Sequence, residues 1–541
     1  MPHAALALQP AQGLRGVSDA FYSGLRQFVC SREAQAMQHS DMERELEARG
    51  QELMRTLFQA WLDVQAPGEA GEPVVDTTNQ ERGRKRVQQR TLETVFGTVS
   101  VERAGYGAEG EDSLHPLDAK LNLPAERYSL ELRRRAAEEA SRNSFDETVE
   151  TLARYTGAHI SKRQVEELVQ RAARDFDAFY EARRDAEVVA SGEGGSVDAE
   201  PVATGSVETG SVLVLTCDGK GVVMHAADLR PATHKAAERT QHKLQTRLSK
   251  GEKRHRKRMA TVAAVYTVPP YVRTPEQVLE AVARLRAERP DPQRPRPECK
   301  RVWASVEQEP EDVLVEAFRE ALDRDRTGEK RWAAVVDGNE TQIGILEQLA
   351  EASGIELTIV LDLFHVLEYL WKAAHALEKE GSTALEQWVL ERLLEILRGR
   401  ASHVAAGMRR SATRRHLPMK QRAPVDRCAN YLLYYKHYLA YDQYLAAGLP
   451  IASGVIEGAC RHLVKDRLGR TGARWRLSGA EAVLRLRALR TSNDFDEYWR
   501  FHEAREFERN HQAHYAGGNV PELHRPTRVQ SPNAARLTRL K

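Results

Sequence analysis

The chain has 541 residues, more than the roughly 250 to 300 at which a single hydrophobic core usually stops growing, so several domains are expected. Charged residues make up 29% of it, and no apolar run approaches the roughly 20 residues of a membrane-spanning helix, which excludes such a helix. The five cysteines form no Cys-x-x-Cys pair, so neither a disulfide framework nor a zinc site is expected. The net charge of +2 leaves nucleic-acid binding to be judged from local charge.

Composition and periodicity divide the chain into segments of different character. The first residues lack the basic start and long apolar stretch of a signal peptide, so we expect a cytoplasmic protein. The predicted segments are a helical N-terminal region (1–80), a β-hairpin module (81–120), a helix-turn-helix DNA-binding region (121–188), a flexible linker (189–210), the first part of an α/β core (211–364), a helical insertion (365–450), the C-terminal helices of the core (451–505) and a basic tail that is expected to be disordered (506–541).

A basic run and a hairpin signal follow the N-terminal helices. The run GRKRVQQR precedes RTLETVFGTVSVER, whose alternation predicts a β-hairpin that turns near Phe96-Gly97. The basic run either contacts phosphate or is a solvated face.

Two capping-box spacings predict the helix-turn-helix. Ser144 with Glu147, and Ser161 with Gln164, mark two helix starts, and the segment 155–158 between them is a plausible tight turn. The second helix would present Lys162, Arg163 and Gln164 to base edges. A plain helical hairpin is the alternative.

Residues 235–258 form a second basic segment. They hold ten lysines or arginines against two acids, the charge expected of an arm that follows a phosphate backbone, with Arg254, Arg256 and Lys257 as the expected DNA contacts. A solvated loop is the alternative.

Short apolar runs repeatedly end in an acidic residue. VLVLTCDGKG delivers Asp218, RWAAVVDGN delivers Asp337, IELTIVLD delivers Asp362, and SGVIEG opens a helix that carries Glu457. One Asp-Gly after a strand is ordinary turn chemistry, but its recurrence favours a metal site.

The order of elements selects among these acids. Strands are predicted at 212–221, 259–268, 301–308, 332–336 and 355–361, with helices at 310–325 and 341–352. Three strands followed by alternating helices and strands predict a mixed α/β sheet in the order of an RNase-H-like core. In that order the second acid ends the fourth strand, which selects Asp337 over Asp362, although Asp362 stays an alternative. The tyrosines between 431 and 441 are better explained by packing than by base stacking.

The segment SGVIEGACRHLVKDRLGRTGARWRLSGAEAVLRLRALRTS resembles the C-terminal signature of insertion-sequence transposases of the ISKra group. TCDGKG, VVDGN and LDLFHV resemble other blocks of that family, over roughly 121–499. The resemblance implies an RNase-H-like catalytic domain with the triad Asp218, Asp337 and Glu457, and it matches Asp362 and His365 to an accessory Asp-x-x-His element. Many relatives carry a cysteine-rich element after the N-terminal hairpin, which this chain lacks between Cys30 and Cys217.

The chemistry of the residues agrees with this assignment. Two Mg²⁺ (or Mn²⁺) ions about 4 Å apart can activate an oxygen nucleophile and stabilise an oxyanion leaving group, and carboxylates are their preferred ligands. Asp218 would bridge both ions, and Asp337 and Glu457 would each complete one. A structural or positioning role is favoured for His365 over metal ligation.

Basic residues near Glu457 are expected to contact the DNA backbone. Arg461 and Lys465 follow Glu457 by four and eight residues and would share its helix face. The alternative is that Lys465 and Arg467 only pair with Asp466 or nearby acids. Arg474 and Trp475 would clamp a displaced base, or Trp475 is buried.

The sequence therefore predicts a DNA transposase that cleaves the ends of a mobile element and joins them to target DNA. Its partners would be double-stranded DNA, both terminal repeats and target, and further copies of the chain in a synaptic complex, with a nucleoid-associated location. The alternatives are an RNase-H-like nuclease without joining activity and a domesticated, non-catalytic DNA-binding protein.

Overall fold

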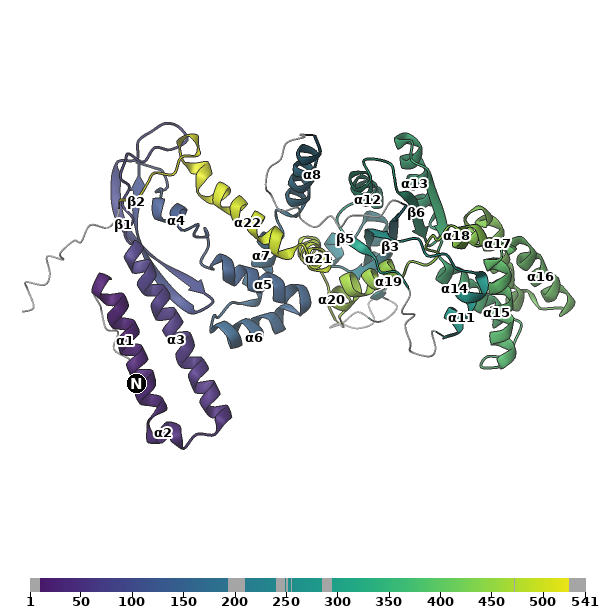
Figure 1. Cartoon of the computed structure of the whole chain (residues 1–541), viewed down its shortest axis with the longest axis horizontal. Coiled ribbons are helices and arrows are strands. Elements are labelled where there is room, and N and C mark those ends of the chain that lie inside the picture. The colour runs from purple at the N-terminus through teal and green to yellow at the C-terminus, as the bar shows by residue number, and fades with distance from the viewer. Residues whose placement is uncertain are drawn as a thin grey trace, which may run out of the picture. The chain divides into compact units, whose positions relative to one another are not determined.

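The computed structural model describes residues 10–192, 210–239, 249, 252–253, 255–284, 294–470 and 472–524. The chain divides into two compact units, of which the first joins Met1–Tyr180 to Phe495–Lys541 and the second is Glu181–Asp494. The first unit is thus discontinuous in sequence (Figure 1). No helix within the described residues is long and apolar enough to cross a membrane.

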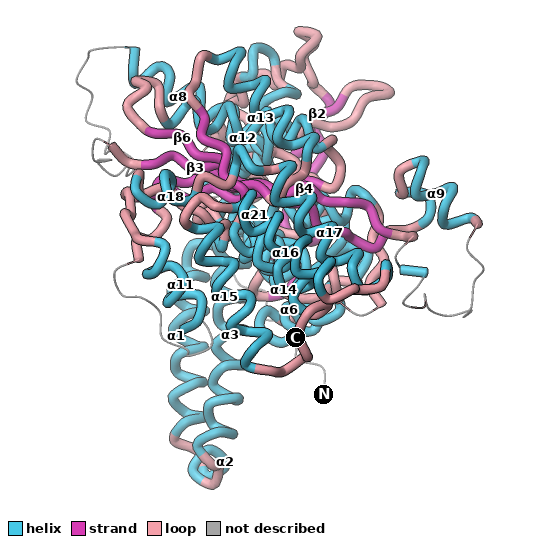
Figure 2. The backbone as a smooth tube through the Cα atoms, turned by 90° about the vertical axis from the view of Figure 1, so that its right-hand side faces the viewer, coloured by secondary structure: helices cyan, strands magenta, loops and turns pink. Residues whose placement is uncertain are grey.

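The first unit begins with helices and a β-hairpin. Helices α1 (Pro10–Val29) and α3 (His39–Gln65) lie side by side, joined through α2 (Arg32–Gln35) (Figures 1 and 2). Strands β1 (Arg84–Thr94) and β2 (Gly97–Gly107) pair antiparallel, and Thr94 faces Gly97, so Val95-Phe96 is the tight loop. The predicted hairpin is confirmed, but the basic run is part of its first strand and does not precede it.

The helix-turn-helix elements follow α4 (Pro116–Lys120) and α5 (Leu130–Arg142). Helix α6 (Phe145–Thr156) begins with the capping box of Ser144 and Glu147, and α7 (Lys162–Ala172) with that of Ser161 and Gln164. Gly157 ends α6 at φ 65°, the left-handed conformation that glycine adopts without steric cost. Both predicted helix starts are confirmed.

The C-terminal part of the chain differs from its prediction. Helix α22 (Phe495–Asn510) falls in the first unit, whereas the sequence placed residues up to 505 in the core. Beyond it, Tyr515 packs in a hydrophobic cluster with Val74 and Ala119, so the expectation of a disordered tail is wrong for 506–524. The rest of that tail, 525–541, lies outside the described residues. Residues 193–209 of the predicted linker also lie outside them, and the linker's first residues form the end of helix α8 (Phe176–Gly192).

The second unit is built on a mixed sheet of five strands in the order β5-β4-β3-β6-β7. Strands β3, β4 and β5 pair antiparallel, whereas β3, β6 and β7 pair parallel. The strands are β3 (Val212–Val223), β4 (Lys257–Val268), β5 (Glu298–Ser305), β6 (Arg331–Val336) and β7 (Leu357–Leu361). The predicted mixed α/β class is confirmed.

Helices cover both faces of this sheet. Helices α12 (Pro310–Arg324) and α13 (Glu340–Ser353) lie on one side of the strands, and α19 (Gly454–Ala459), α20 (Asp466–Leu468) and α21 (Leu477–Thr491) lie on the other (Figure 1). The first six residues of β3 are buried accordingly, which explains their unbroken apolar run. The sequence did not predict α9 (Pro231–Glu238) or α11 (Pro275–Arg284).

The predicted insertion at 365–450 is helical. Its helices are α14 (Leu363–Ala374), α15 (Thr383–Leu397), α16 (Ala401–Arg414), α17 (Met419–Tyr434) and α18 (Tyr441–Ala446). It separates strand β7 from the helix that carries Glu457.

Candidate functional site

Two of the predicted acids lie at the same level of neighbouring parallel strands. Thr216 of β3 is in register with Val335 of β6, so the register brings Asp218 level with Asp337, one residue beyond the end of β6. The Asp218 carboxylate accepts from the Gly219 N–H at 2.6 Å through Oδ1 and from the Cys460 thiol at 3.2 Å through Oδ2.

Asp337 is held in a turn between β6 and α13. Its Oδ1 accepts from the backbone N–H of Asn339 at 2.9 Å, and the Asn339 side chain caps α13 by accepting from the N–H groups of Thr341 and Gln342. Burial raises the pKa of Asp337, and the negative charge of Asp218 adds to that increase.

Glu457 comes from the first turn of α19. Burial raises its pKa, and the charges of Asp362, Asp218 and Glu368 add to that increase. The charge of Asp218 therefore acts on both Asp337 and Glu457, and the charge of Asp362 acts more strongly on Glu457.

His365 on α14 faces the same group. Its charge lowers the pKa values of both Asp337 and Glu457, opposing the effect of burial. The imidazole of His365 thus acts electrostatically on the same two acids as Asp218 does, and its positioning role stays a prediction.

Asp362 occupies a different environment. It is only 1% exposed, its Oδ1 caps α14 by accepting from the Phe364 N–H at 2.7 Å, and its Oδ2 accepts from both the backbone N–H (2.8 Å) and the hydroxyl of Ser453. The Ser453 side chain does not cap α19, because its hydroxyl donates to Asp362. Asp362 is buried whereas Asp218 and Asp337 are partly exposed, so accessibility favours Asp337 over Asp362 as a metal ligand.

The residues predicted to read DNA in α7 are engaged with their own unit. Lys162 pairs with Asp146 at 2.7 Å, Arg163 pairs with Glu167 at 3.2 Å although it is 88% exposed, and Gln164 completes the capping box. In the basic segment, Arg254 lies outside the described residues, Arg256 accepts the Met224 N–H with its carbonyl, and Lys257 begins β4.

The DNA contacts predicted near Glu457 differ in their surroundings. Arg461 and Lys465 lie in a π-helix, Cys460–Lys465, and both are exposed, so a shared face with Glu457 stays a prediction. Arg461 lies 4.0 Å from Asp466. Trp475 is 6% exposed and donates its indole N–H to the Leu468 carbonyl at 3.1 Å, so it is a core side chain and is not available for base stacking. Arg474 beside it is exposed.

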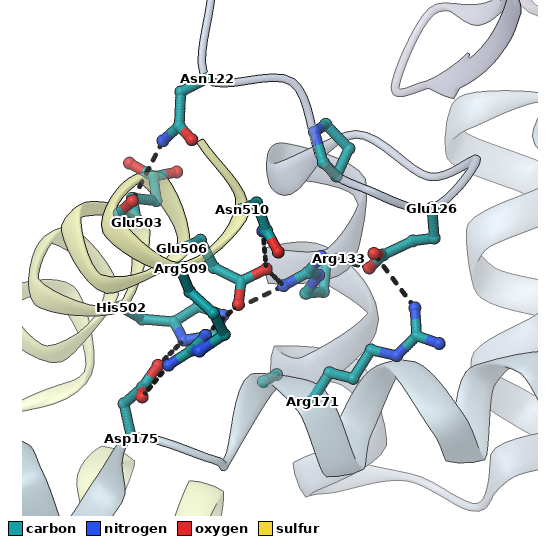
Figure 3. A network of polar contacts seen from close by, with 12 residues as sticks. Asn122, Glu126, Arg133, Arg171, Asp175, His502, Glu503, Glu506, Arg509 and Asn510 are labelled. Atoms are coloured by element: carbon teal, nitrogen blue, oxygen red, sulfur yellow. Dashed lines mark hydrogen bonds and ion pairs between the residues drawn. The ribbon is translucent and has the colours of Figure 1, made fainter. Parts of the chain in front are cut away.

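A second acidic cluster, in the first unit, was not predicted. Within the described residues, one group of three potential metal ligands has its ligand atoms within 4.8 Å of one another: Asp175, His502 and Glu506. Arg133 donates to Glu506 at 2.6 Å, Arg509 donates to Asp175 at 2.5 Å, and His502 contacts Asp175 at 2.7 Å (Figure 3). The arginines supply the positive charge that a metal ion would bring, so we interpret this cluster as a buried ion-pair network.

The acids of the second unit are spaced more widely than that. Around a single Mg²⁺ ion with ligands at about 2.1 Å, two oxygens lie at most roughly 4.2 Å apart. Asp218, Asp337 and Glu457 do not form a group of that kind. Two ions about 4 Å apart would accept a wider set of ligands than one ion does.

Sequence reasoning missed Cys460 and Glu368 beside the acids. Their places three residues after Glu457 and three after His365 are the only signals, and that spacing alone does not identify a site residue.

No protein-family model matches the chain, and no curated protein is similar to it.

Proposed function

We propose that the chain is a metal-dependent DNA transposase whose catalytic acids are Asp218, Asp337 and Glu457. The observation that carries this proposal is geometric: the register of β3 and β6 brings Asp218 level with Asp337, and the thiol of Cys460, three residues after Glu457, donates to the Asp218 carboxylate. The order and directions of the five strands support an RNase-H-like core, with the acids on the first strand, after the fourth and on a later helix.

The three carboxylates would hold two Mg²⁺ (or Mn²⁺) ions, with Asp218 shared between them. The ions would supply activation of an oxygen nucleophile and stabilisation of the leaving 3′ oxygen. His365 acts beside Asp337 and Glu457 as a hydrogen-bond donor that orients the scissile phosphate. Cys460 orients Asp218 through its thiol, which burial keeps in the neutral form by raising its pKa.

Exposed basic side chains would bind the DNA backbone. The ion pairs of Lys162 and Arg163 are solvent-exposed and contribute roughly 0 to 1 kcal/mol each, so a phosphate can replace their acidic partners at little cost. Arg461, Lys465 and Arg474 are exposed in the unit that carries the acids. Because transposition joins two element ends, the active form is a homo-oligomeric synaptic complex on nucleoid DNA.

The test is strand joining in Mg²⁺. A labelled duplex that carries the ends of the DNA segment encoding this chain is incubated with plasmid and with the parent, Asp218→Asn, Asp337→Asn or Glu457→Gln. Asp466→Asn is the matched control, because Asp466 is an exposed acid on the segment after Glu457. We expect joining to be lost in the three variants and kept in the control, with DNA binding by gel shift unchanged in all.

Other results would contradict the proposal. Cutting without joining would indicate a nuclease, and binding by the parent without cutting under any metal would indicate a non-catalytic DNA-binding protein. Joining that survives Asp337→Asn would remove Asp337 from the site.

A further inference from the structure

Tyrosine hydroxyls of the helical insertion donate to backbone carbonyls at the ends of two strands. Tyr441 donates to Leu361 at 2.7 Å, and Tyr444 donates to Ile359 at 3.3 Å, along β7, which is an edge strand of the sheet. These two bonds cover carbonyls that the sheet leaves unpaired.

The other two tyrosines contact the turn that carries Asp337. Tyr431 donates to the carbonyl of Asp337 at 3.3 Å, and Tyr435 donates to the carbonyl of Gly338. Gly338 has a φ of 92°, and a β-carbon there would lie 3.3 Å from the Tyr431 hydroxyl and the Tyr435 ring. The turn is therefore packed directly on the tyrosines.

The tyrosine rings are themselves fixed. Tyr369 of α14 stacks on Tyr431 with ring centroids 4.0 Å apart and planes at 11°, and Tyr431 contacts Tyr435 at 4.9 Å. Burial raises the pKa values of Tyr431 and Tyr435, so both remain hydrogen-bond donors at neutral pH.

The Asp337 carboxylate also forms a hydrogen bond within the same turn. Oδ1 accepts from the Asn339 N–H at 2.9 Å, so the orientation of the two peptide groups after Asp337 determines where the carboxylate lies. Tyr431 and Tyr435 hold the carbonyl ends of these peptide groups.

We infer that Tyr431 and Tyr435 are positioning residues that hold Asp337 in the geometry required for metal binding. This inference rests on the proposed function, because it assumes that Asp337 is a metal ligand. The helical insertion thereby contributes to the acidic site although it supplies none of the three proposed metal ligands.

The experiment measures Mn²⁺ binding to the full chain, with electron paramagnetic resonance of free Mn²⁺ as the readout. Tyr431→Phe, Tyr435→Phe and the double variant each remove hydroxyls but keep the rings. Tyr444→Phe is the matched control, because it also removes a hydroxyl that donates to a strand carbonyl, but at Ile359. Asp337→Asn reports the loss of the ligand itself, and thermal unfolding of each variant reports stability.

We expect the double variant to weaken Mn²⁺ binding about tenfold, as the loss of groups that support metal ligands commonly does, and Tyr444→Phe to leave it unchanged. Equal binding by the parent and the double variant, with Asp337→Asn impaired, would overturn this inference and leave the proposed function standing. Mn²⁺ binding that does not depend on Asp218, Asp337 or Glu457 would overturn both.

Discussion

Like charges crowd together at the acidic site of the second unit. Burial and the neighbouring Asp218 charge raise the pKa values of Asp337 and Glu457, so in the folded chain the ionised forms are disfavoured. At pH values between the pKa of these groups in the unfolded chain and their raised pKa in the folded chain, the native state therefore binds more protons than the unfolded state. These two groups therefore favour folding more at low pH, and this contribution falls as pH rises through the raised pKa.

Neutralising an acid of the site should thus stabilise the metal-free protein. At pH 7 without divalent metal we expect Asp337→Asn to raise Tm by about 1 to 3 °C. A gain of somewhat less than roughly 1 kcal/mol in the free energy of unfolding has this effect in a domain of this length. Mn²⁺ should raise the Tm of the parent and have less effect on the variant. Scanning calorimetry at pH 7 and pH 4.5 checks both the sign and its pH dependence, since the gain should shrink at the lower pH. A variant less stable than the parent at pH 7 would contradict this account of the site.

At the scale of elements, the sequence predicted the strands and helices of the second unit well. The run at 332–336 is continuous and apolar because all five residues are buried in the parallel strand β6, and the capping boxes of α6 and α7 are local patterns. The choice of Asp337 over Asp362 rested on this element order and stays a prediction.

Contacts between distant residues were beyond the sequence. Asp362 and Ser453 lie 91 residues apart, as do Tyr438 and Glu347, and nothing in either local pattern identifies the partner. The π-helix at Cys460–Lys465 and the burial of Trp475 could not be predicted either, because tertiary packing determines both. Tyr431 and Tyr435 were recognised as a packing stripe, but their carbonyl partners could not be.

The bond between Asp362 and Ser453 should be a structural brace between β7 and α19. We expect Asp362→Ala to destabilise the second unit by about 2 to 4 kcal/mol, because it leaves the buried N–H and hydroxyl of Ser453 unpaired. Ser453→Ala removes only the hydroxyl and should cost roughly 1 kcal/mol. Urea unfolding measures both. Equal costs, or none for Asp362→Ala, would reopen a metal-binding role for Asp362.

At the scale of the whole chain, the second unit is an insertion within the first. Helix α22 completes a fold whose other elements precede the second unit in sequence. Arg133 of α5 is fully buried and pairs with both Glu126 and Glu506, and the Tyr498 hydroxyl donates to the Ala172 carbonyl at 2.5 Å. The helix-turn-helix region therefore depends on residues from the far end of the chain.

The ion-pair network around Arg133 should determine whether α22 stays folded onto the first unit. Glu506→Gln leaves a buried guanidinium with one acidic partner instead of two, and removing a partner from a buried pair typically costs about 3 to 5 kcal/mol. In hydrogen exchange of the full chain we expect faster exchange in α5 and α22 and unchanged exchange in β3 and β6. Glu508→Gln, an exposed acid on the same helix, is the control.

Acid should have the same effect on the first unit as Glu506→Gln. Burial alone would raise the pKa values of Asp175 and Glu506, but the charges and hydrogen bonds of their cationic partners outweigh burial and lower them. A lowered pKa gives stability that is present above the unfolded value of about 4 and is lost as pH falls through the folded one. Exchange in α5 and α22 should therefore accelerate below about pH 4. At the same pH values the second unit should behave in the opposite way, because protonation of Asp337 and Glu457 relieves the repulsion between its acids. Protection that fades equally in β3 would contradict the assignment of this network to the first unit alone.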